Sequence, residues 1–150
     1  MLKNIQEWFK TQLEDKSASE ESNTIELATA VLFYEVMRAD REFTESEELS
    51  YRQQLVKHFS LSETDLQTLC NMTKVKAESA VDYQQFTKVL NDLYNPEQKR
   101  SILDSLWSLA YADHVLSPDE DYTIRKIADL LYIPHSQFIQ SKLAIQPDKT

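Results

Sequence analysis

Glycine is absent from all 150 residues. Tight hairpins and β-bulges normally use glycine, because it adopts positive φ without a steric cost. Helices do not need it internally, so the composition predicts an all-α protein. The P-loop, the dinucleotide-binding fingerprint and the G-x-S-x-G elbow all require glycine and are therefore excluded. With these motifs missing, we expect a protein that is not an enzyme.

Cysteine and long apolar runs are also scarce. Cys70 is the single cysteine, so no internal disulfide can form. The N-terminal region has no apolar run of the length that a signal peptide or a membrane span needs. We therefore expect a cytoplasmic chain whose length suits one domain with its own core.

Positive charge is in deficit. The chain has 16 Lys and Arg against 25 Asp and Glu, which gives a net charge of −9. A phosphate backbone repels such a chain unless its basic residues gather on one face, and the sequence shows no such gathering. The charge argues against nucleic acid as a partner and leaves divalent cations and basic protein surfaces open.

Apolar residues recur at three- and four-residue spacing between helix-start signals, and this pattern predicts about seven to eight helices. Capping boxes at Asn23-Thr-Ile-Glu26, Thr44-Glu-Ser-Glu47 and Ser117-Pro-Asp-Glu120 mark three of the starts, and the apolar pattern is weak over residues 75–80. Asn95-Pro96 marks another, with proline at the first helical position. The chain divides into residues 1–14 as an amphipathic helix, 15–23 as a polar linker, 24–143 as the helical domain and 144–150 as a tail.

The N-terminal helix has three open roles. Its apolar face consists of Leu2, Ile5, Phe9 and Leu13, with Trp8 beside it. The helix could dock on the core of its own domain, or pair through Trp8 and Phe9 with a partner helix, which a second copy of the chain could supply. A membrane surface is disfavoured, because the few lysines here are offset by nearby acids.

One segment of the chain occurs twice. Residues 39–48 align with residues 112–121 without a gap, at an offset of 73 residues, which is the separation of Asp40 and Asp113. Alanine, aspartate, an apolar residue, a hydroxyl residue and glutamate coincide. We interpret the match as two helix-loop-helix repeats with Asp40 and Asp113 at equivalent points.

The repeated pattern resembles a known family. Ala39-Asp40, Phe43 and Glu47, with Ala112-Asp113, Leu116 and Glu120, are similar to the motif of the tellurite-resistance TerB-like family, which includes the N-terminal domain of DjlA-type membrane co-chaperones. The resemblance covers about residues 24–143. It implies an all-α domain with pseudo-twofold halves, acidic residues associated with divalent cations, a role in bacterial stress, and no catalysis. Family members usually have glycine after the aspartate, where this chain has Arg41 and His114.

Two interpretations of the acidic loops remain. An aspartate at a helix C-terminus is unfavourable by about 0.3–1 kcal/mol, so a positive group should compensate it. In the first interpretation a divalent cation, Ca²⁺ or Mg²⁺, binds to loop oxygens. The candidate ligands are Asp40, Glu42, Thr44 and Glu47 in the first loop and Asp113, Ser117 and Glu120 in the second. The first loop has more ligands and is favoured.

In the second interpretation the acidic side chains are internal helix caps, and the protein is a structural interaction domain without metal. Our preferred hypothesis is a non-enzymatic, cytoplasmic TerB-like binding module. Its acidic repeat loops would form an interaction surface for a protein partner, with or without a bound cation, in a pathway like tellurite resistance. Binding of a metal distinguishes the two interpretations.

Overall fold

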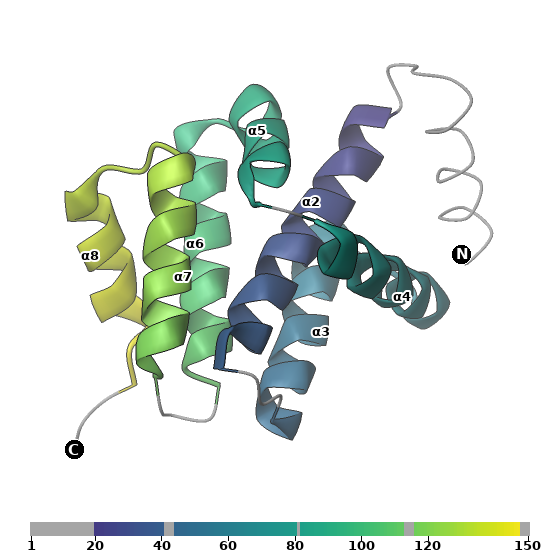
Figure 1. The fold of residues 1–150 in the computed structure, drawn as a ribbon, viewed down its shortest axis with the longest axis horizontal. Coiled ribbons are helices and arrows are strands. Elements are labelled where there is room, and N and C mark those ends of the chain that lie inside the picture. Colours follow the sequence, from purple (N-terminus) through teal and green to yellow (C-terminus); the bar gives the residue numbers. More distant parts are fainter. Residues whose placement is uncertain (1–19, 41–43, 81, 113–115, 148–150) are drawn as a thin grey trace.

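The computed structural model describes residues 20–40, 44–80, 82–112 and 116–147, and these residues form helices joined by short connections (Figure 1). No strand occurs among them, so the all-α prediction is confirmed. The helices in chain order are α2 (Glu20–Met37), the 3₁₀ turn η1 (Arg38–Asp40), α3 (Glu45–Phe59), α4 (Glu63–Ser79), α5 (Gln84–Leu93), α6 (Pro96–Ala110), α7 (Pro118–Leu130) and α8 (His135–Ile145).

Helix α2 is the centre of the fold. Every residue from Ala28 to Met37 is buried, because this stretch is apolar around almost its whole circumference. It packs against α3, α4, α5, α6 and α7. Figure 1 shows the consequence: α4 lies on one side of α2, while α6, α7 and α8 form a layer on the other.

Helix α8 is attached to the outside of this layer by aromatic and ionic contacts. The Phe138 ring lies 5.2 Å from the Trp107 ring, and the Arg125 guanidinium stacks 4.8 Å above Phe138. Lys142 Nζ donates to Asp121 Oδ2 at 2.6 Å. These contacts hold α8 against α6 and α7.

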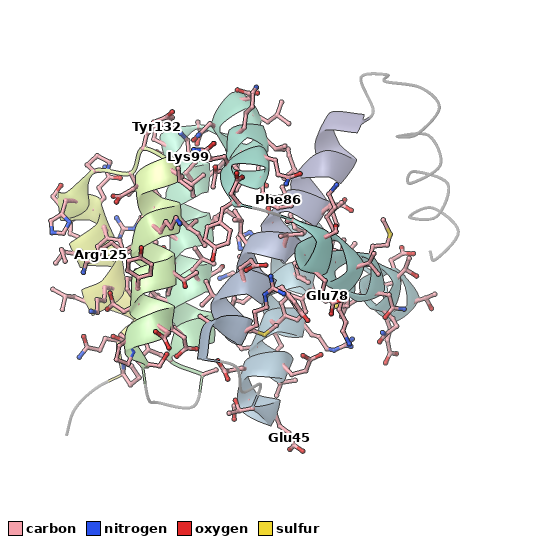
Figure 2. The ribbon with its side chains drawn as sticks, in the orientation of Figure 1. Glu45, Glu78, Phe86, Lys99, Arg125 and Tyr132 are labelled. Carbon is pink, nitrogen blue, oxygen red and sulfur yellow. The ribbon has the colours of Figure 1, made fainter. Side chains whose placement is uncertain are left out.

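The helix ends agree with the predicted capping signals. Thr44, Asn95 and Ser117 are N-caps, each within a complete capping box. Two residues take the left-handed conformation that glycine would favour: Ser60 after α3 (φ 51°) and Tyr132 after α7 (φ 59°). Figure 2 shows Lys99 beside Tyr132, and the Lys99 ammonium is 5.8 Å from the Tyr132 ring centroid.

The helix boundaries differ from the predicted layout at three points. Helix α2 begins at Glu20, which places residues 20–23 of the predicted linker within the helix. Helix α4 continues through residues 75–79, which the apolar pattern left as a weak region. Helix α8 includes residues 144 and 145 of the predicted tail. Residues 1–19, with Trp8 and Phe9, lie outside the described residues.

The helix-loop-helix pairs of the sequence repeat correspond to α2–α3 and α6–α7. In each pair the second helix starts with a capping box and is followed by a left-handed residue. A pseudo-twofold relation between the pairs stays a prediction. None of the described helices combines the length and the apolar character that crossing a membrane requires.

Candidate functional site

The first turns of α3 and α7 have the same hydrogen-bond geometry. In α3, the Glu47 amide donates to Thr44 Oγ1 at 3.0 Å, and the Thr44 amide donates to Glu47 Oε1 at 3.2 Å. In α7, the Glu120 amide donates to Ser117 Oγ at 3.0 Å, and the Ser117 amide donates to Glu120 Oε1 at 3.1 Å. Each glutamate therefore uses its Oε1 atom to fix the start of its own helix.

Both capping glutamates are buried, which is unusual for residues in a first turn. Glu47 and Glu120 are each 1% exposed. The second oxygen of each carboxyl group, Oε2, is also buried and makes no hydrogen bond with any described residue. A buried acceptor without a donor costs about 1–3 kcal/mol, and more if it is charged. At the starts of α3 and α7, these two oxygens are therefore buried polar atoms that still lack a hydrogen-bond donor among the described residues.

The two carboxyl groups interact with each other. The pKa of Glu120 is raised from 4.5 to about 8. Burial is the largest cause, the neighbouring Glu47 carboxyl group contributes to the rise by hydrogen bonding to the protonated form and by its charge, and the hydrogen bonds from Ser117 lower the pKa. Two buried carboxylates so close together cannot both stay ionised without a compensating positive charge. The geometry therefore suits either a retained proton or a bound cation between Glu47 and Glu120.

The structure rearranges the predicted ligand set. The sequence treats the two loops as separate sites, whereas the fold brings together one glutamate from each. Thr44 and Ser117, predicted as ligands, have hydroxyl groups that already serve as helix caps. The remaining candidates, Glu42, Asp113 and the side chain of Asp40, lie outside the described residues.

Comparison with protein families identifies the fold. The family model described as Tellurite resistance protein TerB matches residues 26–143. The chain belongs to this family. Searches of curated proteins and of solved structures gave no match. The matched range of the TerB domain runs from α2 into α8 and includes both loops, Glu47 and Glu120.

The described part of the TerB domain does not form a complete metal site alone. It contains no group of three or more His, Cys, Asp or Glu side chains arranged to hold a metal ion. Glu47 and Glu120 supply two carboxyl groups, and further oxygens would have to come from water or from residues outside the described set. Among the described residues, the candidate site therefore consists of the unpaired Oε2 atoms of Glu47 and Glu120.

Sequence reasoning missed a second acidic pair in the TerB domain. The pKa of Glu26 is raised from 4.5 to about 7, mainly by burial and also by the charge of Asp65 on α4. The sequence assigns Glu26 to a capping box that begins at Asn23, but α2 starts earlier, so Glu26 lies inside the helix. The available signal was an acidic residue between the apolar positions Ile25 and Ala28.

Proposed function

We propose that this TerB-family chain is a non-enzymatic binding module in which a divalent cation bridges Glu47 and Glu120. The observation that supports this is the pair of buried Oε2 atoms, one from each loop, without a donor among the described residues. Hard cations bind carboxylate oxygens. A cation between the two groups would replace the proton and compensate both charges at once.

The number of protein oxygens favours Mg²⁺ over Ca²⁺ at this position. Ca²⁺ takes six to eight oxygen ligands, whereas Mg²⁺ keeps several waters and often binds through one or two carboxylates. Asp40 and Asp113, which precede the two glutamates in the chain, are the further ligands that the sequence suggests, with Glu42 in the first loop. The Thr44 and Ser117 hydroxyls would support the site by holding the helix starts.

The bound cation would join the starts of α3 and α7 and thereby set the shape of the acidic surface around the two loops. Because this chain has a net charge of −9, a partner protein with a basic surface fits this role best. A cytoplasmic setting and a tellurite-resistance-like stress pathway complete the proposal.

A second candidate function needs no metal. In a structural interaction domain, a proton retained by Glu120 would satisfy the pair, and both glutamates would act only as internal caps. The raised pKa of Glu120, about 8, favours this alternative. The two functions differ in one measurable property, which is the response of the protein to divalent cations.

The test is a titration of metal-free protein with Mg²⁺, Mn²⁺, Ca²⁺ and Zn²⁺ by calorimetry and thermal unfolding. Saturation at 100 times the dissociation constant should add about 2.7 kcal/mol to the free energy of unfolding. Glu120→Gln should abolish the response, because a neutral amide is a poor ligand but keeps the cap. Glu45→Gln is the control: Glu45 lies in the first turn of α3 but is exposed (Figure 2).

Two results would support the metal-free alternative instead. One is the absence of binding at concentrations below about 1 mM, which is too weak for a dedicated site. The other is a cation response of Glu120→Gln equal to that of the wild type, which would place any bound metal elsewhere.

A further inference from the structure

Helix α4 has an apolar groove on its outer face. The groove has a volume of about 350 Å³ and is lined by Asn71, Met72, Val75, Lys76 and Ser79. Val75 is 69% exposed. The opposite face of α4 is already used, because Leu69, Thr73 and Ala77 are fully buried and α4 packs on α2.

The lining residues form one stripe along α4. Residues 71, 72, 75, 76 and 79 recur at three- and four-residue intervals; Met72 and Val75 are its apolar residues, and the other three are polar. In helical proteins the apolar part of such a stripe is commonly covered by the apolar face of another helix. The exposure of Val75 means that no described helix covers this one.

We infer that this groove is the docking site of the chain's own N-terminal segment, residues 1–19. The segment has an apolar face of matching type, made of Leu2, Ile5, Phe9 and Leu13. As a helix, residues 2–13 would be about 18 Å long, which exceeds the roughly 12 Å from residue 71 to residue 79 of α4. The inference is independent of cation binding.

The path of the chain places the segment within reach of the groove. Helix α4 packs against α2, and Asp65 near the start of α4 is close enough to Glu26 for its charge to act on that side chain. Glu20 lies about 9 Å before Glu26 along the α2 axis, and Asn71 lies about 9 Å beyond Asp65 along the α4 axis. A linker of five residues spans up to about 17 Å, so the linker and the segment together are long enough to cover the distance from Glu20 to the groove.

Covalent attachment favours this occupant over a separate molecule. A short flexible tether gives the segment an effective concentration in the millimolar range, so a modest apolar contact is enough to keep it bound. A second copy of the chain would have to compete with this local concentration. We therefore expect a monomer with a covered α4 face.

The two tryptophans of the full-length chain provide the test, because Trp8 belongs to the segment and Trp107 is fully buried in the core. In fluorotryptophan-labelled protein, Val75→Asp should move the Trp8 fluorine resonance to its solvent-exposed position and leave that of Trp107 unchanged. Amides of residues 1–14 should exchange about tenfold faster. Leu143→Asp, on α8 and 65% exposed, is the matched control and should change neither.

The variant Phe9→Ser tests the same contact from the segment side and should also move the Trp8 fluorine resonance to its solvent-exposed position. It leaves α4 unchanged, so its result does not depend on how well the Val75→Asp variant folds. An unchanged Trp8 resonance in both variants would overturn the inference. So would light scattering that shows a wild-type dimer which Val75→Asp separates, since the occupant would then be a second copy.

Discussion

At the scale of single residues, Glu47 and Glu120 each use their two carboxyl oxygens for different purposes. Oε1 accepts a backbone amide and fixes a helix start, while Oε2 is buried without a donor among the described residues. The cap needs only an acceptor, which glutamine also provides. The charge of the carboxylate is therefore a separate property that a substitution can remove.

Glu120→Gln should be tolerated in metal-free protein. Because the pKa of Glu120 is raised to about 8, the side chain is protonated at pH 7, and glutamine copies its shape and neutrality. The free energy of unfolding should stay within about 0.5 kcal/mol of the wild type. Urea unfolding in the presence of a chelator measures this. A loss above about 2 kcal/mol would mean that the folded protein needs the charge at this position.

Glu26 should make the stability depend on pH. Its pKa rises from 4.5 to about 7 on folding, so the folded state binds the proton more tightly than the unfolded chain does. The stabilisation is complete below about pH 4.5 and is lost as the pH rises through 7. Between pH 5 and 7.5 the free energy of unfolding should fall by on the order of 2 kcal/mol more in the wild type than in Glu26→Gln, after allowance for solvent screening.

Urea unfolding of both proteins at several pH values tests this difference, with Glu97→Gln as an exposed control in the first turn of α6. Parallel curves for the wild type and Glu26→Gln would show that Glu26 does not retain its proton on folding.

At the scale of helices, the absence of glycine leaves Ser60 in a left-handed conformation at the end of α3. A residue with a Cβ atom pays about 1 kcal/mol there. Ser60→Gly should therefore raise the free energy of unfolding by about 0.5–1 kcal/mol, with part of the gain offset by the greater entropy of the unfolded chain.

Ser101→Gly, at an exposed position inside α6, should instead lose about 0.5–1 kcal/mol, because glycine weakens a helix interior. Thermal unfolding of both variants decides the matter. Destabilisation by Ser60→Gly would mean that the serine side chain contributes more than the left-handed conformation costs.

Helix starts were predictable to the extent that their signals are local. The boxes at Thr44 and Ser117 lie within four consecutive residues, so the sequence alone locates them. The start of α2 was missed because Asn23 is a good cap residue in isolation, and the acidic residues before it continue the helix. The end of α4 was missed because Val75 faces outward, so residues 75–79 show no inward apolar period.

The candidate site was predictable only in its parts. The repeat indicated that Glu47 and Glu120 are equivalent residues. Their side chains lie close together only because of the way α3 and α7 pack against α2. No local pattern contains that information. The burial of both side chains, on which the chemistry depends, likewise follows from tertiary packing.

At the scale of the whole molecule, Phe138 is the large buried side chain through which α8 packs on the rest of the fold. This ring is 2% exposed and packs on Trp107 and Arg125. Phe138→Ala should lower the free energy of unfolding by about 3–5 kcal/mol, since a large buried ring leaves a cavity. Leu143→Ala on the exposed side of α8 should change it by less than about 0.5 kcal/mol. Equal effects in urea unfolding would show that α8 does not pack through this face.

The central claim is that the fold brings two acidic loops together so that one cation can bind between Glu47 and Glu120. Anomalous diffraction from crystals grown with Mn²⁺ tests it most directly. The account predicts one peak within about 2.0–2.6 Å of Oε2 of both glutamates. A Mn²⁺-containing crystal with no peak there, and with the two carboxyl groups sharing a proton, would contradict it.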